Sequence, residues 1–194
     1  MKKESKEKIK NFTVEVLDFL LNIPQALATG FDRGGMYQLM HDFPYEQELT
    51  CSKISQIFSN LKNRGYIEVR KHGGQESVIF TNKARLAIVD KIAERSKNEN
   101  KHFFVSFDIP EDERQGRDQF RRIIKRLGFR QIQKSLWVAN KNFGEFVELA
   151  AYEYGVENYI VYLVSENTNI DGVILKMFEK WKIDCAHDPK ERKE

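Results

Sequence analysis

Apolar positions in the first hundred residues follow helical spacing first and strand spacing afterwards. Residues 6–21 place apolar side chains on one side of an amphipathic helix, and residues 36–41 can form a short second helix. Thr50 can cap a third helix that runs to about Arg64 and ends before Gly65. The buried stripe of this third helix has the spacing i, i+3, i+4, i+7 and comprises Ile54, Ile57, Phe58 and Leu61.

A β-hairpin and a closing helix follow the third helix. Two short strands are predicted at residues 66–71 and 76–81, on either side of the turn signal Gly73-Gly74. A helix over residues 83–95 completes this part of the chain. This element order is that of a winged helix-turn-helix, with the hairpin as the wing and the Thr50–Arg64 helix as the recognition helix.

The second half of the chain alternates strands and helices in the order βαββαβ. The predicted elements are strand 103–107, a helix from the acidic residues after Pro110 to Gly128, strands 129–133 and 136–139, helix 143–154 and strand 158–164. That order predicts a ferredoxin-like domain, so the fold class is α+β. One more amphipathic helix is expected at residues 171–181.

A polar, unpatterned stretch separates the two halves and gives the predicted domain boundaries. These are a winged helix-turn-helix DNA-binding domain at 1–96, a linker at 97–101, a ferredoxin-like dimerisation domain at 102–166, and a C-terminal helix with a charged tail at 167–194.

The distribution of charge is more informative than the formal net charge of +3. Positions 53–71, on the predicted recognition helix and wing, contain five lysines and arginines and a single acidic residue, Glu68. Basic side chains can neutralise phosphates, while amide and hydroxyl side chains can read base edges in a major groove. The predicted DNA-binding residues are Ser52, Lys53, Ser55, Gln56, Ser59, Asn60, Lys62, Arg64, Arg70 and Lys71. An ordinary solvated helix face and a module for protein contacts are the alternatives.

A longer motif adds a family resemblance. The segments Phe107-Asp108-Ile109-Pro110-Glu111, Leu127-Gly128-Phe129 and Gln131–Val138 resemble the middle domain of PaaX-type repressors. That domain is itself similar to the small CRISPR-associated endonuclease (Cas-two), in which an aspartate ends the first strand, as Asp108 does here. The resemblance implies a transcriptional repressor. PaaX-type repressors usually carry a further C-terminal domain, so an acyl-coenzyme A effector, or any small-molecule effector, is left open here.

The endonuclease side of the resemblance gives the rival interpretation. There the chain would be a metal-dependent nuclease or a subunit of a CRISPR adaptation complex, with Asp108 as catalytic residue and Mg²⁺ ligand. Asp108 can instead cap the turn after its strand, and no second ligand accompanies it, so we expect no enzyme activity and no cofactor. A catalytically silent scaffold for another protein is a third option.

A second group of basic residues surrounds the helix after Pro110 and allows two interpretations. It can form a groove for a nucleic-acid backbone, or keep the helix soluble by pairing with acidic neighbours; the second interpretation is favoured slightly. The group comprises Arg114, Arg117, Arg121, Arg122, Lys125, Arg126, Arg130 and Lys134.

The expected partners are double-stranded DNA and a second copy of the chain. Apolar residues on both faces of the first strand of the βαββαβ unit predict that one sheet face packs against that of a second copy, giving a homodimer. No apolar run is long enough for a membrane helix, and the two cysteines, Cys51 and Cys185, form no CxxC pair. A cytoplasmic protein without a membrane partner is therefore expected.

Overall fold

The structure, a computed structural model, describes residues 2–22, 35, 38–40, 42–44, 49–72 and 75–186. The chain divides into two compact units, Met1–Glu94 and Arg95–Glu194. Both contain helices and antiparallel strands, so the fold is α+β. Among the described residues no helix has the length and apolar content needed to cross a bilayer.

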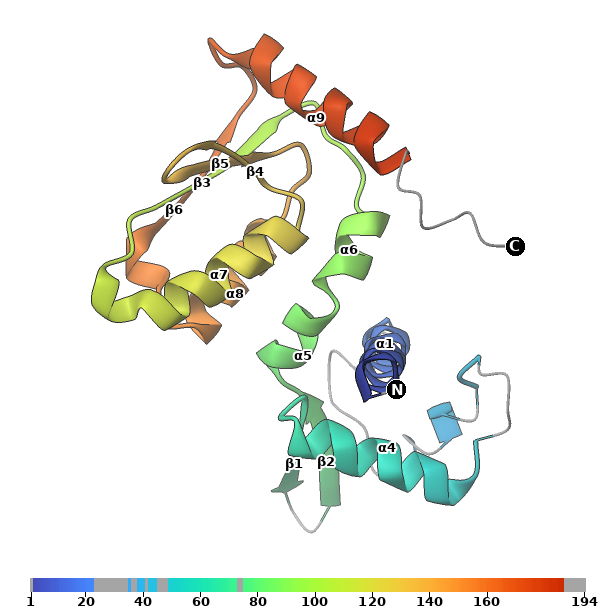
Figure 1. The fold of residues 1–194 in the computed structure, drawn as a ribbon. Coiled ribbons are helices and arrows are strands. Elements are labelled where there is room, and N and C mark those ends of the chain that lie inside the picture. Colours follow the sequence, from blue (N-terminus) through green and yellow to red (C-terminus); the bar gives the residue numbers. More distant parts are fainter. Residues whose placement is uncertain are drawn as a thin grey trace. The chain divides into compact units, whose positions relative to one another are not determined.

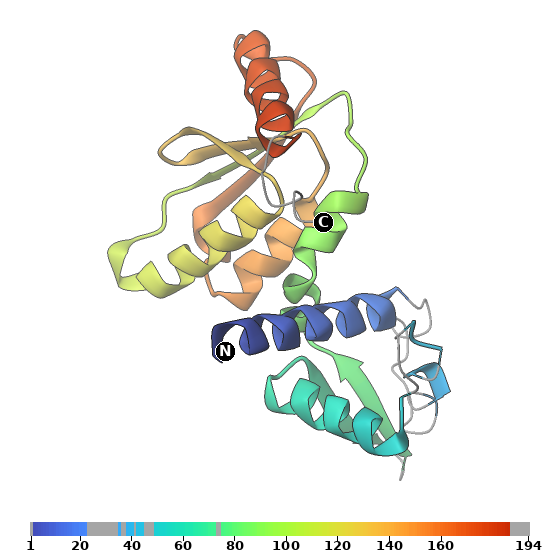
Figure 2. The ribbon, with the colours of Figure 1, turned by 45° about the vertical axis from the view of Figure 1, so that its right-hand side comes forward.

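In its described part the first unit contains helices and one antiparallel hairpin, and α4 lies beside that hairpin (Figures 1 and 2). Its elements are α1 (Lys2–Leu21), α4 (Cys51–Asn63), β1 (Ile67–His72), β2 (Gln75–Phe80), α5 (Asn82–Ala87) and α6 (Val89–Arg95). Leu17 of α1, Ile54 and Leu61 of α4 and Val78 of β2 belong to one buried apolar cluster. This shared core fixes α4 and the hairpin within the same unit.

The ends of α4 follow from its sequence. The Thr50 hydroxyl accepts the backbone N–H of Lys53 at 3.4 Å and so caps the first turn. After the C-cap Arg64, Gly65 adopts a φ of 70°, which glycine reaches without the cost that a Cβ would add. The prediction of a helix between Thr50 and Arg64 is confirmed.

Some predicted elements of the first unit differ in the structure or lie outside its described part. The predicted helix 83–95 is two helices, α5 and α6, which meet at Ile88. Ile88 and Val89 are consecutive β-branched residues, which lowers helix propensity at that point. The backbone N–H of Ile88 accordingly bonds three residues back, to the carbonyl of Arg85, at 3.3 Å. The predicted turn Gly73-Gly74 and most of the predicted helix 36–41 lie outside the described residues.

The second unit contains one four-stranded antiparallel sheet in the order β4-β5-β3-β6. Its elements are β3 (His102–Phe107), the short 3-10 helix η1 (Glu111–Glu113), α7 (Arg114–Arg126), β4 (Arg130–Gln133), β5 (Leu136–Ala139), α8 (Gly144–Glu153), the 3-10 helix η2 (Glu157–Tyr159), β6 (Ile160–Ser165) and α9 (Asp171–Ala186). Every predicted strand and helix of this unit is present, although strand 158–164 begins two residues later because η2 precedes it.

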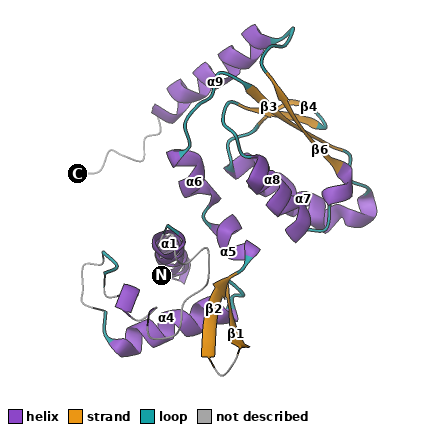
Figure 3. Cartoon of the chain, turned by 180° about the vertical axis from the view of Figure 1, so that it is seen from behind, coloured by secondary structure: helices purple, strands orange, loops and turns teal. Residues whose placement is uncertain are grey.

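Helices lie on both faces of this sheet (Figure 3). On one face Phe107 of β3 packs against Phe120 of α7, with ring centroids 5.4 Å apart. On the other face Ile174 of α9 packs against Phe104 and Val138, and all three are buried. From the sequence we expected a second copy of the chain to cover one sheet face, with no helix of the same chain on it. The absence of a helix there is wrong, because α9 folds back over part of this face. The β6 side of the face stays exposed, at Val161 and Leu163.

Candidate nucleic-acid interface

The solvent-facing side of α4 is polar or basic throughout. Ile54 and Leu61 point into the core, and no aspartate or glutamate occurs between Cys51 and Asn63. Helical spacing therefore places the predicted contact residues of this element on the surface. The exposed residues of this set are Ser52, Lys53, Ser55, Gln56, Ser59, Asn60 and Lys62, with Arg64 at the C-cap.

The hairpin carries the remaining two predicted residues, Arg70 and Lys71, both exposed on β1. Each of them has an acidic neighbour: Arg70 contacts Glu68 at 3.2 Å, and Lys71 contacts its cross-strand partner Glu76 at 3.1 Å. Exposed ion pairs of this kind contribute about 0–1 kcal/mol. Exchanging the carboxylate for a phosphate would therefore cost little, but the two pairs lower the net positive charge of the hairpin.

Hydrogen bonds at the end of α4 hold the helix and the hairpin together. The backbone N–H of Tyr66 donates to the carbonyl of Leu61 at 2.9 Å, and the Thr81 hydroxyl donates to the carbonyl of Gly65 at 2.7 Å. The Arg64 guanidinium donates to the Thr13 hydroxyl of α1 at 3.3 Å. Arg64 therefore links two helices in addition to being a candidate phosphate contact.

One basic residue beside this junction was not predicted from the sequence. Lys83 of α5 is exposed, and its ammonium group lies 5.8 Å from the centroid of the Tyr66 ring. It also lies near Gly65, since a Cβ added to that glycine would be 3.9 Å from the Lys83 Nζ. Lys83 follows the hairpin in the sequence, so only the closing of the unit brings it back to the end of α4.

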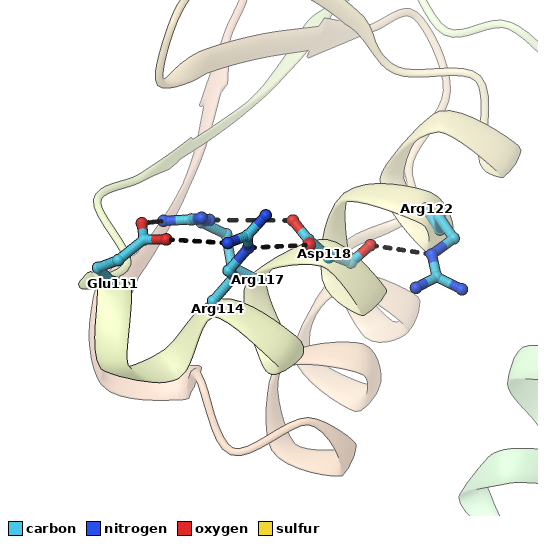
Figure 4. A network of polar contacts seen from close by, with 5 residues as sticks. All are labelled: Glu111, Arg114, Arg117, Asp118 and Arg122. Carbon is cyan, nitrogen blue, oxygen red and sulfur yellow. Dashed lines mark hydrogen bonds and ion pairs between the residues drawn. The ribbon is translucent and has the colours of Figure 1, made fainter.

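Three arginines of the second basic group make polar contacts along α7 (Figure 4). Arg117 donates to Glu111 at 2.7 Å, and Arg114 lies 3.8 Å from the same carboxylate. This hydrogen bond and the charge of Arg117 lower the pKa of Glu111. Arg122 donates to the backbone carbonyl of Asp118 at 3.2 Å. For Arg114 and Arg117 these contacts favour the interpretation in which the arginines pair with acidic neighbours.

Two other basic residues of the group lie over aromatic rings of the sheet. The Arg121 guanidinium is 5.6 Å from the centroid of Phe107, and the Lys125 ammonium is 5.9 Å from that of Trp137. Their aliphatic stems thus cover apolar surface beside the core.

Asp108 lies at the end of β3 and is exposed. Its backbone N–H donates to the carbonyl of Tyr159 at 3.2 Å, but its carboxylate makes no hydrogen bond or ion pair with any described residue. The turn-capping hydrogen bond that the sequence allows as an alternative is therefore not formed. Within the described part of the chain no three His, Cys, Asp or Glu residues gather as metal ligands.

The geometry around Asp108 can be compared with the needs of Mg²⁺, which the endonuclease interpretation implies. Magnesium requires several oxygen ligands in a near-octahedral arrangement. Asp108 instead shares its pocket with Arg117, Arg121 and Lys134, whose charges repel a divalent cation. The residues of this chain around Asp108 do not fit a magnesium site.

One comparison with known proteins gave a match, and it falls in the second unit. Residues 95–172 match the family model of the PaaX protein central Cas2-like domain. This match spans β3 to the start of α9, and it confirms the resemblance found in the sequence. Neither the curated proteins nor the solved structures gave a match.

Proposed function

We propose that this protein is a sequence-specific DNA-binding transcriptional regulator that acts as a repressor. The match of residues 95–172 to the PaaX central-domain model supports this proposal. The observation that carries this proposal is the exposed face of α4, which lacks acidic residues and adjoins a basic hairpin within one unit. In the proposal the first unit is a winged helix-turn-helix, α4 enters the major groove and the hairpin contacts the backbone.

The second unit is proposed to be a ferredoxin-like dimerisation domain. The strand order β4-β5-β3-β6 and the βαββαβ succession support that assignment. A second copy is proposed to cover Val161 and Leu163, which are 53% and 51% exposed on the edge strand β6. The sequence of β6, IVYLVS, contains neither a charged residue nor a proline to protect this edge. A homodimer would present two recognition helices to an inverted repeat.

The experiment begins with selection of preferred sites from a random duplex pool, followed by fluorescence anisotropy on the selected duplex and a scrambled one. We expect affinity to fall steeply with salt, because phosphate contacts release counterions. Gln56→Ala and Asn60→Ala should each reduce the difference in binding free energy between the selected and the scrambled duplex. The expected reduction is about 1–3 kcal/mol where the side chain pairs with a base in a bidentate way. Arg70→Ala and Lys71→Ala should weaken both duplexes alike and reduce the salt slope by about one each.

Lys176→Ala provides the matched control, because Lys176 is an exposed lysine on α9 in the other unit. It should leave both affinities unchanged. Absence of duplex binding at low salt would exclude the proposed function. Equal decreases in affinity for Lys176→Ala and Lys71→Ala would point to a diffuse charge effect and remove the wing from the interface.

A further inference from the structure

Three elements of the second unit line an open cavity of about 340 Å³ at one end of β3. The strand end supplies Ser106 to Ile109, α7 supplies Arg117 and Arg121, and the turn between β4 and β5 supplies Lys134 and Ser135. The turn is held against the strand end, since the backbone N–H of Phe107 donates to the carbonyl of Ser135 at 3.0 Å. The cavity is thus a built feature of the sheet and of α7.

Positive charge dominates the lining of this cavity. Arg117, Arg121 and Lys134 line it together with one carboxylate, that of Asp108. Arg117 is already paired with Glu111 at 2.7 Å, which leaves Arg121 and Lys134 as the cations with no acidic partner among the described residues. Their charge is balanced only by the nearby Asp108.

Arg121 is the cation in the cavity that lacks both a hydrogen-bond partner for its Nε and a counter-ion among the described residues. Its side chain is half-buried, and its Nε is fully buried without a hydrogen-bond partner. Its guanidinium carbon lies 5.6 Å from the centre of the Phe107 ring, and it forms no ion pair with a described residue. A partly desolvated cation without a counter-ion is unfavourable, and an anion in the cavity would relieve that cost.

We propose that this cavity binds the phosphate group of a small molecule. A phosphate monoester carries close to two negative charges, which suits two unpaired cations, and a guanidinium can bind its oxygens in a bidentate way. The hydroxyls of Ser106 and Ser135 line the same cavity and can donate to further oxygens. A volume of this size falls within the usual range for small-molecule sites. The inference stands independently of DNA binding by the first unit.

The test is titration of inorganic phosphate into the full chain, followed by ³¹P NMR at constant ionic strength. Saturable binding to one site per chain is expected, and Arg121→Gln should weaken it on the order of ten-fold or more. Arg122→Gln, one position along the same helix but outside the cavity, should leave the affinity unchanged. Equal weakening in both variants, or binding that does not saturate, would overturn the proposal.

Because Arg121 packs over Phe107, a second variant is needed that leaves the core untouched. Lys134 is exposed on the β4–β5 turn, and Lys134→Gln should weaken phosphate binding several-fold without changing the melting temperature. An oligonucleotide without terminal phosphates serves as competitor. If it displaced phosphate at an equal concentration of phosphate groups, the site would belong to a nucleic-acid backbone and not to a small ligand.

The effect of Asp108→Asn on ligand affinity distinguishes an anion site from a metal site. Its carboxylate repels a bound phosphate, so Asp108→Asn should tighten phosphate binding by about three-fold. In a metal site the same substitution would remove a coordinating carboxylate and weaken metal binding. Magnesium chloride that raised the melting temperature of the wild type but not of Asp108→Asn would overturn the proposal. Tighter phosphate binding by Asp108→Asn, with no effect of magnesium on either protein, is the expected result.

Discussion

Asp171, the first residue of α9, contacts Thr168 and His102 at the start of that helix. Its carboxylate accepts the backbone N–H of Thr168 at 2.8 Å and the Thr168 hydroxyl, and it lies 3.1 Å from the Nε2 of His102. The Thr168 hydroxyl contributes most to lowering the pKa of Asp171, and the charge of His102 adds to it. The charged form of Asp171 thus anchors the helix whose Ile174 covers the sheet.

This lowered pKa predicts an acid-dependent stability. A carboxyl whose pKa is lower in the folded state stabilises the protein above its ordinary pKa, near 3.8, and loses that contribution as the pH falls through the folded value. The free energy of unfolding of the wild type should therefore exceed that of Asp171→Asn at pH 6, and the difference should shrink below about pH 4. Urea unfolding from pH 3 to pH 7 measures both. A difference that stayed constant across this range would contradict the role of the charge.

At the same scale, helical spacing allowed the surface residues of α4 to be predicted, but their partners could not be. The positions of Ile54 and Leu61 in the apolar stripe determine that Gln56 and Asn60 face solvent. The pairing of Lys71 with Glu76 depends instead on the register of the hairpin. The cavity beside Asp108 was also beyond prediction, because α7 and the β4–β5 turn converge there only in the folded sheet.

At the scale of elements, α7 approaches the turn after α8 so closely that a glycine is required. A Cβ added to Gly116 would lie 2.6 Å from the backbone carbonyl oxygen of Tyr154 and 2.9 Å from a methyl group of Val156. Backbone atoms cannot move aside as the end of a side chain can. Gly116 therefore sets the distance between α7 and the chain that leaves α8.

Gly116→Ala should lower the free energy of unfolding by about 1–3 kcal/mol, because the new methyl group overpacks a rigid contact. Gly172 gives the matched control, since it lies in the first turn of α9 and a Cβ added there would meet open space. Gly172→Ala should raise stability by about 0.5–1 kcal/mol through helix propensity. Chemical denaturation of both variants decides the matter. Stabilisation by both substitutions would show that the close contact at Gly116 is not maintained.

The elements themselves followed closely from the sequence where local signals were strong. Apolar stripes together with Thr50, Gly65 and Gly128 defined α4 and α7. The break at Ile88 was missed because the apolar period continues through it. The place of α9 was missed for another reason: an amphipathic pattern shows that a helix has a buried face, but not which surface covers that face.

At the scale of the whole molecule, α9 changes what a second copy of the chain can contact. It buries Phe104 and Val138, so the exposed apolar surface of this sheet face lies on β6 at Val161 and Leu163. The homodimer proposed above therefore centres on β6, at the edge of the sheet, and not on the whole face.

Isolated residues 101–194 should then remain dimeric in light scattering, whereas residues 1–96 should be monomeric and bind DNA poorly.

The full chain gives the stricter test of this dimer. Wild type should elute at twice the mass of one chain in size-exclusion chromatography with light scattering. The double variant Val161→Lys, Leu163→Lys should be monomeric, because burying two unpaired charges against a second copy is costly. Tyr152→Lys is the control: Tyr152 is 71% exposed on α8, and α8 covers the face of the sheet opposite to Val161 and Leu163. Dimerisation that survived the double variant but not Tyr152→Lys would place the interface on the helical face.

The same monomeric variant links assembly to DNA recognition. Two recognition helices joined by a dimer bind an inverted repeat with a high effective concentration at the second half-site, an advantage that disappears on a single half-site. The double variant should therefore bind a single half-site as tightly as the wild type but show affinity for the full inverted repeat that is lower on the order of a hundred-fold. Anisotropy titrations of both proteins on both duplexes measure this. An equal decrease on the half-site and the full repeat would mean that β6 stabilises the fold and does not join two DNA-binding units.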